Sequence, residues 1–397
     1  MIKNVKYSKM NNDYRTKLVH LGRSTAKSNN TVNPPLSRAS TVVFNTLAEF
    51  KASYQQPTFT NLRYGRSGTS TVFELQNAMA ELEQVESCIA TACGLSAAIA
   101  VIAAHAGVGK HILVSEGVYG PVRAFCDDEL IKQGTQVSYF SESEQLTKKI
   151  QSNTALIYLE VPASITMELI DISNVCKQAH KTSIPVACDS TWGTPHFFKP
   201  HQLGIDISIH AATKYINGHS DVMLGLITAS NAYMPPIRQW CDRFGSHASP
   251  DACWLTLRGL RTLSVRMQQH QENAFIVANW LLKQNEVKKV IFPPLFTGKA
   301  LELYQQQFSG CAGPFTFELH VCNETNFEKF IDGLVLFGLG TSWGGFESLV
   351  MPAIAHQDRA KDVMPDNGRL VRLHIGLEAP HDLCHDLRSA LSHIPTP

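Results

Sequence analysis

Short apolar segments alternate with helical stretches through the middle of this 397-residue chain. The apolar segments cover residues 111–114, 136–140, 155–160, 184–189, 206–210 and 223–229. Helical stretches begin near residues 121 and 172, between these segments. Each segment is as short as a single strand, and most are apolar along their length, which is typical of strands covered on both faces. The alternation therefore predicts right-handed βαβ units and a mostly parallel sheet between two layers of helices.

The N-terminal part of the chain differs from this alternating region. Residues 1–66 are polar and rich in turn formers, such as Asn33-Pro34-Pro35. Such a segment cannot bury enough apolar surface to form its own core, so we expect an arm that lies on another surface. From residue 72 apolar residues recur at helical spacing, and residues 97–104 predict a wholly buried helix.

The C-terminal part predicts a second, smaller domain. A long helical region runs from about residue 251 to 283, and Pro293-Pro294 follows it. Beyond these prolines we expect helices near residues 326 and 380 and strands at residues 314–320, 347–350 and 370–375, a mixture typical of an α+β domain. The predicted division is an arm at residues 1–66, a large domain at residues 67–262 and a C-terminal α+β domain at residues 263–397.

The composition excludes several classes of protein. Hydrophobic residues make up 44% and charged residues 17% of the chain, as in ordinary soluble proteins. The 35 Lys and Arg residues balance the 34 Asp and Glu residues, so we expect neither nucleic acid nor an anionic membrane as a partner. No apolar run approaches the roughly 18 residues that span a bilayer, and the first residues lack the apolar core of a secretory signal. The ten cysteines form no CxxC pair, which indicates reduced thiols and a cytoplasmic location.

A lysine and an aspartate stand at the ends of two apolar segments. Lys214 lies where a β-rich segment gives way to the turn Gly218-His219-Ser220-Asp221. Asp189 ends the apolar run 184–188, upstream in the chain. An amine and a carboxylate at the ends of buried strands suit pyridoxal phosphate (PLP), because the lysine can bind the aldehyde and the acid can keep the pyridine nitrogen protonated. These two residues predict a PLP site.

Two segments of the large domain carry further candidates. Gly94 and Leu95 lie at the start of a predicted helix, where backbone N–H groups and the helix dipole favour a phosphate. A closely packed helix start has the same sequence pattern. Tyr119 precedes a Gly-Pro turn, and its ring can either lie on a planar cofactor or pack in the core.

Two arginines are candidates for anion binding. Arg66 follows Tyr64-Gly65 in a polar loop, where it is either a bidentate donor to a phosphate or a solvated charge. Arg372 lies in a strand-like run and, if it points inward, needs an anionic partner such as the carboxylate of an amino acid. Its alternative is an edge-strand residue that faces water.

Three other sequence patterns resemble functional motifs but do not match them fully. Residues 107–111 resemble part of a phosphate-binding loop, but Ala104 stands where the first glycine is required. His381 and His385 share a helix face without a third ligand, which favours solvent-facing side chains over a metal site. Ser67-Gly68 is not part of a GxSxG elbow, so a serine hydrolase has no support.

Together these segments resemble the Cys/Met-metabolism family of PLP enzymes over nearly the whole chain. The most specific segments are residues 211–220, Ala-Ala-Thr-Lys-Tyr-Ile-Asn-Gly-His-Ser, and residues 250–263. Further matches lie at residues 18–23 and 372–378. The resemblance implies a fold-type I PLP-dependent transferase fold, with a mostly parallel seven-stranded sheet in the large, PLP-binding domain. It also implies a homotetramer built from two dimers, with active sites shared between subunits.

The resemblance implies roles for the candidate residues as well. Lys214 would bind the cofactor covalently, Asp189 would contact its pyridine nitrogen, and Tyr119 would stack on its ring. The phosphate would be bound by Gly94, Leu95 and Thr213, and by Tyr64 and Arg66 from the neighbouring subunit. Glu160 and Ser164 would lie near the cofactor hydroxyl. Substrate would be bound by Arg372, Ser342, Trp343 and Tyr64, and protons transferred by Lys214, Tyr119 and Tyr64.

One position departs from the family pattern. Ala211 stands three residues before Lys214, where relatives often carry a serine that contacts the phosphate. We expect the phosphate to be bound slightly less tightly, without loss of the cofactor.

Residues 341–348, Thr-Ser-Trp-Gly-Gly-Phe-Glu-Ser, resemble the β-lyase branch of the family, as do residues 163–168. This resemblance implies β-elimination of L-cystathionine to L-homocysteine, pyruvate and ammonia, in methionine biosynthesis. Thr341 is neither the glutamate of many γ enzymes nor the aromatic residue expected of a β-lyase. A cystathionine γ-lyase or γ-synthase, a methionine γ-lyase and a broad cysteine desulfhydrase therefore stay open. So do a fold relative without catalysis and an unrelated binding protein.

Overall fold

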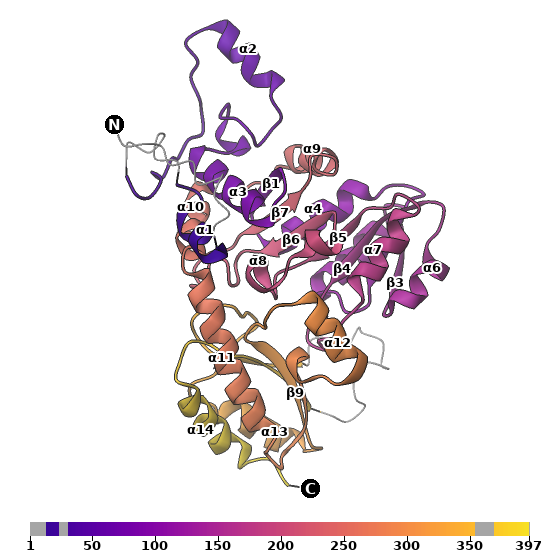
Figure 1. Cartoon of the computed structure of the whole chain (residues 1–397), viewed down its shortest axis with the longest axis vertical. Helices are drawn as coiled ribbons and strands as arrows, with labels where there is room; N and C mark the ends of the chain where they lie inside the picture. Colours follow the sequence, from indigo (N-terminus) through magenta and orange to yellow (C-terminus); the bar gives the residue numbers. More distant parts are fainter. Residues whose placement is uncertain (1–12, 24–30, 354–368, 397) are drawn as a thin grey trace.

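Two β-sheets form the framework of the protein (Figure 1). The computed structural model describes residues 13–23, 31–353 and 369–396. The larger sheet has seven strands in the order β1-β7-β6-β5-β4-β2-β3. They are β1 (Ser87–Thr91), β2 (His111–Ser115), β3 (Gln136–Phe140), β4 (Thr154–Glu160), β5 (Val186–Asp189), β6 (Ile207–Ala211) and β7 (Gly225–Ala229). Only β7 among these is reversed, antiparallel to both β1 and β6. The predicted α/β class with a mostly parallel seven-stranded sheet is confirmed.

Alternate residues of the central strands enter two separate apolar clusters, one on each face of this sheet. In β2, Ile112 and Val114 join the cluster around α4 (Gly94–His105) and α9 (Met234–Phe244), whereas Leu113 joins the other cluster. The second face is covered by α3 (Ser70–Glu83), α7 (Ile172–His180) and α10 (Pro250–Leu260). Burying each aliphatic side chain contributes about 1.5–3 kcal/mol, so both faces stabilise the sheet.

Helix α4 is less buried than the sequence predicted. Ala97, Val101 and Ile102 are buried. Ile99 and Ala103, on another side of the helix, are only half-buried. The prediction of a wholly buried helix was wrong, because α4 packs on the sheet with one face and leaves its other face partly open.

The smaller sheet has five strands in the order β10-β11-β12-β9-β8. They are β8 (Val287–Ile291), β9 (Pro314–Leu319), β10 (Gly338–Leu339), β11 (Leu349–Pro352) and β12 (Arg369–His374). Helices α12 (Gly298–Gln307), α13 (Glu324–Asp332) and α14 (Pro380–Leu391) belong to this part. The long helix α11 (Leu263–Leu281) runs from the region of the larger sheet to that of the smaller one (Figure 1).

The helical region expected at residues 251–283 is two helices. Helix α10 ends at Leu260 and α11 begins at Leu263. The predicted domain boundary after residue 262 falls at this break, and the division into domains stays a prediction.

The N-terminal segment has little apolar packing of its own. Helix α1 (Tyr14–His20) packs near α11, whereas α2 (Leu47–Gln55) stands apart from the rest of the chain (Figure 1). Val43 is 89% exposed and Leu47 67% exposed. The segment is joined to α10, where the Trp254 indole donates to the carbonyl of Pro34 at 3.0 Å. Contact of this arm with a neighbouring subunit stays a prediction.

Shorter elements complete the fold. They are the helices α5 (Gly120–Ala124), α6 (Leu146–Lys149) and α8 (Thr194–Phe197), the π-helical turn η3 (Phe125–Leu130), and the 3₁₀ turns η2 (Gly65–Ser67), η4 (Ser143–Gln145), η5 (Pro200–Leu203) and η6 (Pro293–Leu295). Among the described residues, no helix combines the length and the apolar character needed to cross a bilayer.

Candidate active site

Three neighbouring parallel strands end at one edge of the larger sheet. Glu160 ends β4 and Asp189 ends β5, and these two residues are register partners. Strand β6 is parallel to β5 and ends at Ala211, three residues before Lys214. Because carboxyl ends of parallel strands meet at one edge, the fold brings the predicted acid and the predicted lysine to the same place.

Lys214 has a hydroxyl and an aromatic ring as its neighbours. Its Nζ donates to Oγ of Ser342 at 2.9 Å and lies 5.3 Å from the centre of the Trp343 ring. Burial lowers the pKa of Lys214 to about 8, with Arg372 lowering it further and Asp189 opposing the shift. Near neutral pH more of this amine is therefore unprotonated than in an ordinary lysine, and the free amine can act as a nucleophile or a base.

Asp189 is held by the residue two positions further on. The hydroxyl of Thr191 donates to Oδ1 at 2.5 Å, and the Thr191 N–H donates to the same oxygen at 2.9 Å. None of the described residues donates to Oδ2. Burial raises the pKa of Asp189, although the two bonds from Thr191 oppose that shift.

Tyr119 lies at the start of α5 and is joined to Glu160. Its backbone N–H donates to Oε2 of Glu160 at 2.6 Å, and its side chain is 46% exposed. Burial raises the pKa of Tyr119, and the Glu160 carboxylate raises it further while Arg372 lowers it. The phenol is therefore neutral at physiological pH and has a proton to donate.

The start of α4 packs directly on the end of β6. A Cβ on Gly94 would lie 2.4 Å from Cβ of Ala211, so only glycine allows this approach. The N–H groups of Gly94 and Leu95 precede the first bond of the helix, which Ala97 donates to Cys93. The hydroxyl of Thr213 donates to the Leu224 carbonyl at 3.2 Å and accepts from the Leu224 N–H at 2.9 Å.

Arg372 is a buried cation on the middle strand of the smaller sheet. Its Nη2 donates to the carbonyls of Thr341 at 2.8 Å and Ser342 at 3.0 Å, and no carboxylate of the described residues forms an ion pair with it. Burial lowers its pKa to about 10. The alternative of a water-facing residue on an edge strand was wrong, because β12 lies between β11 and β9 and Arg372 is only 8% exposed.

Tyr64 and Arg66 have no described contact with this group. Arg66 donates to the carbonyl and to a carboxylate oxygen of Asp242, in α9, both at 2.8 Å. Tyr64 is 47% exposed and forms a backbone bridge with Thr41. Ser164, the remaining predicted position, donates its N–H to the carbonyl of Gly117 at 2.8 Å.

Thr191 and His374 also contact this group, although neither was a predicted site residue. Thr191 follows Asp189 by two residues, a spacing at which an aspartate side chain commonly accepts from a backbone N–H, so the sequence contained a usable signal. His374 contacts the glycines that follow Trp343. No local pattern indicates that contact, because about thirty residues separate the partners.

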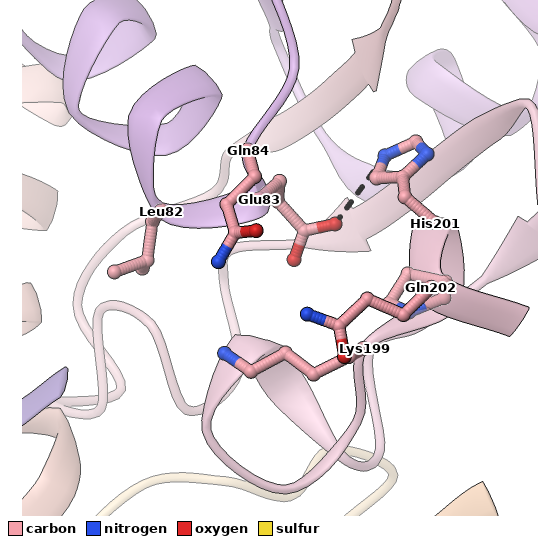
Figure 2. A pocket seen from close by; sticks show the side chains of 7 residues that line it. Leu82, Glu83, Gln84, Lys199, His201 and Gln202 are labelled. Carbon is pink, nitrogen blue, oxygen red and sulfur yellow. Dashed lines mark ion pairs between the residues drawn. The ribbon is translucent and has the colours of Figure 1, made fainter.

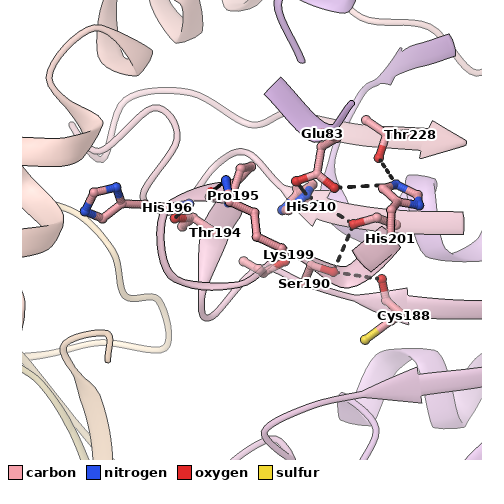
Figure 3. Close-up of polar contacts among 12 residues, drawn as sticks. Glu83, Cys188, Ser190, Thr194, Pro195, His196, Lys199, His201, His210 and Thr228 are labelled. Atoms are coloured by element: carbon pink, nitrogen blue, oxygen red, sulfur yellow. Dashed lines mark hydrogen bonds and ion pairs between the residues drawn. The ribbon is translucent and has the colours of Figure 1, made fainter. Parts of the chain in front are cut away.

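A separate polar group is buried beneath β6. The Glu83 carboxylate lies 3.4 Å from Nε2 of His210 and 3.5 Å from Nε2 of His201, and we call these three residues the Glu83 cluster. The Ser208 hydroxyl lies 3.2 Å from Nε2 of His210 and donates to the Ser190 hydroxyl at 2.9 Å, which extends the cluster toward the end of β5. Figure 3 shows Glu83, His201, His210 and Ser190 in this part of the molecule. Burial raises the pKa of Glu83, but His210, His201 and Lys199 outweigh burial and the net direction is down.

A small pocket borders this cluster and not the group around Lys214. Figure 2 shows its lining, which is formed by Leu82, Glu83, Gln84, Lys199, Pro200, His201 and Gln202. No predicted site residue belongs to it.

Comparisons with known proteins agree on one family. A family profile described as Cys/Met metabolism PLP-dependent enzyme matches residues 15–392. The chain is 37% identical to cystathionine beta-lyase from Haemophilus influenzae over 396 residues, which cover 96% of this chain and 98% of that protein. It is 35% identical to L-alanine/L-glutamate racemase from Wolbachia pipientis wMel over 392 residues, covering 95% and 96%. The crystal structure of cystathionine gamma synthase from Xanthomonas oryzae pv. oryzae, in complex with aminoacrylate and cysteine, matches with a TM-score of 0.87 at 30% identity, covering 97% and 99%.

Proposed function

Because the chain belongs to the Cys/Met metabolism PLP-dependent enzyme family, we propose that it catalyses β-elimination of L-cystathionine to L-homocysteine, pyruvate and ammonia. The observation that carries this proposal is the arrangement of residues 342 and 343 beside Lys214, with the buried Arg372 bonded to the same segment. The similarity to a protein named cystathionine beta-lyase over almost its full length supports the same reaction. The product would enter methionine biosynthesis.

Three features of the site fit pyridoxal phosphate, the cofactor of this family. The Lys214 amine has a lowered pKa and can bind an aldehyde. The open oxygen of the Asp189 carboxylate can accept from a pyridinium N–H, and the ionised acid would then be stabilised. The N–H groups at the start of α4, where Gly94 leaves no room for a side chain, suit a phosphate. We propose that Tyr119 and Glu160 line the same cofactor site.

Each residue then has a defined task in the reaction. When bound, the cofactor draws the negative charge that develops on substrate Cα into its ring. Arg372 binds the substrate carboxylate, which supplies the anion that the described part of the protein does not place beside this cation. Nζ of Lys214 removes the Cα proton, and the neutral phenol of Tyr119 donates a proton to the departing sulfur.

The N-terminal arm completes the proposal. We propose a homotetramer in which Tyr64 and Arg66 reach the cofactor phosphate and substrate of a neighbouring subunit. Support comes from the exposed tyrosine and from the arm's scarcity of apolar packing of its own. For Arg66 to take this role, its ion pair with Asp242 has to open or to be shared. Thr213 has to redirect its hydroxyl from Leu224 in the same way.

Product analysis on L-cystathionine tests the reaction. The holoprotein should release pyruvate and L-homocysteine, and Lys214→Ala should release neither. Release of 2-oxobutyrate and cysteine would instead assign γ-elimination, and absence of any keto acid would reject the lyase proposal.

A second candidate is racemisation of a small L-amino acid. It is favoured by the 35% identity to a protein named L-alanine/L-glutamate racemase. Both reactions begin with loss of the Cα proton, and racemisation returns a proton to the opposite face of Cα. Formation of D-alanine from L-alanine by the holoprotein, without keto acid, would select this candidate.

A further inference from the structure

One turn carries contacts to both cations of the site. We call residues 341–345 the site turn. The Ser342 hydroxyl accepts from Nζ of Lys214, and the carbonyls of Thr341 and Ser342 accept from Arg372. Gly344 has a φ of +85°, and a Cβ there would lie 2.9 Å from Cβ of Lys214. The backbone of the site turn therefore packs on the lysine segment with no side chain between them.

His374 contacts this turn from behind. It lies on β12 two residues after Arg372, so the two side chains are on the same face of the strand. Its Nε2 lies 3.0 Å from the N–H nitrogen of Gly344 and 3.2 Å from the carbonyl oxygen of Gly345. The side chain is 1% exposed, and the rings of Tyr215 and His270 pack against it.

The ring acts through hydrogen bonds and not through charge. Burial lowers the pKa of His374 well below its usual value, and His270, Arg372 and Lys214 lower it further. A neutral imidazole has one N–H. With the proton on Nε2 the ring donates to the Gly345 carbonyl, and with the proton on Nδ1 it accepts from the Gly344 N–H. In both tautomers His374 therefore bonds to one peptide group of the site turn, through either the Gly344 N–H or the Gly345 carbonyl.

We propose that His374 is a positioning residue: it fixes the site turn so that the Ser342 hydroxyl faces Lys214 and two carbonyls face Arg372. The geometry favours this role over simple packing, because Nε2 meets both polar groups of the turn while Nδ1 is buried without a partner among the described residues. The effect of His374 on turnover rests on the proposed function. Its effect on Lys214 and on the bound cofactor does not rest on that function.

Four variants separate positioning from packing. His374→Leu keeps volume and removes both hydrogen bonds, whereas His374→Gln carries an acceptor and a donor that reach the turn. His374→Asn has the same amide on a shorter side chain. His270→Leu is the matched control, because His270 is equally buried in the same ring cluster but bonds to the Ile375 carbonyl and not to the site turn.

The measurements use the holoprotein. Visible absorbance of the bound cofactor is titrated between pH 6 and pH 10, glycine binding is followed by the same absorbance, and KM and kcat are measured with L-cystathionine. We expect His374→Leu and His374→Asn to shift the titration midpoint. Both variants should also weaken glycine binding by about three- to tenfold and raise KM by the same factor, which is the effect of one neutral hydrogen bond. His374→Gln should lie near the wild type, and His270→Leu should leave the midpoint unchanged.

The result that overturns the inference is a titration and a glycine affinity that are equal in His374→Gln, His374→Asn and the wild type. If the leucine variant fails to fold, the glutamine and asparagine variants still decide the matter. Absence of turnover with L-cystathionine in the wild type would reject the proposed reaction alone, because the absorbance and glycine measurements need no elimination.

Discussion

Two half-buried lysines of this protein share a lowered pKa but have different surroundings. Burial lowers the pKa of both Lys214 and Lys199 to about 8. Lys199 lies 4.0 Å from the Tyr14 ring, donates to the Pro195 carbonyl, and is favoured as a cation by Glu83. Lys214 contacts a hydroxyl and has another cation as its strongest charged neighbour. A lowered pKa therefore does not distinguish Lys214, which we propose as catalytic, from Lys199, whereas the contacts of the two lysines do.

The buried charges around the two lysines repeat this contrast. The Glu83 carboxylate faces two histidines, so the charge and its partners belong to the same chain (Figure 3). Arg372 is nearly as buried but faces only carbonyls among the described residues. A buried cation without an anionic partner is costly unless a ligand supplies one. We read the Glu83 cluster as structural and the group around Lys214 as a ligand site.

The largest expected effect is on activity, when each of the two lysines is replaced in turn. Lys214→Ala should lower the rate of pyruvate formation by more than about 10⁴, because loss of one acid/base group costs about 10²–10⁴ and we propose that this lysine also binds the cofactor. Lys199→Ala should keep most of the activity. After borohydride reduction, peptide mapping should place the cofactor on Lys214 in both the wild type and Lys199→Ala. A reduced cofactor on Lys199 would reverse the comparison.

The second largest expected effect is a loss of folding stability when Glu83 is replaced. Glu83→Leu should lower the free energy of unfolding by about 3–5 kcal/mol, because removing one partner of a buried charged group leaves the others unpaired. Urea unfolding of the holoprotein at pH 7 measures this loss. Glu144→Leu is the control, since Glu144 pairs with Lys299 on the surface, where an ion pair contributes little. Equal losses in the two variants would contradict the structural reading of the Glu83 cluster.

Local signals explain how much of this arrangement could be predicted from sequence. Lys214 and Asp189 were recognisable because each stands at or just after the end of an apolar strand, and parallel strands bring their ends together without further information. The reversed direction of β7 and its pairing with β1 left no such mark, because an apolar strand has the same pattern in either direction. The ion pair of Arg66 with Asp242 joins residues 176 positions apart, and single-residue patterns do not encode such partners.

The third expected effect is on substrate binding by Arg372, the buried cation without an anionic partner among the described residues. Arg372→Leu should raise KM for L-cystathionine by about 10- to 10²-fold, since hydrogen bonds to a charged group contribute about 1.5–3 kcal/mol. Arg369→Leu, on the same strand, should leave KM unchanged, because Arg369 pairs with Glu324 instead. A matched rise of KM in both variants would show that damage to β12, and not loss of carboxylate binding, causes the effect.

The smallest effect is the pH dependence that the Glu83 cluster gives to folding. The folded protein holds the pKa of Glu83 below its usual 4.5, so the ionised form is favoured on folding. The stability that Glu83 contributes is therefore present above pH 4.5 and is lost as pH falls through the folded pKa. Thermal unfolding of the holoprotein at pH 7, 5 and 4 should show a difference between wild type and Glu83→Gln that narrows toward low pH. A difference that widens on acidification would mean that burial outweighs the two histidines, which would contradict the structural role of the Glu83 cluster.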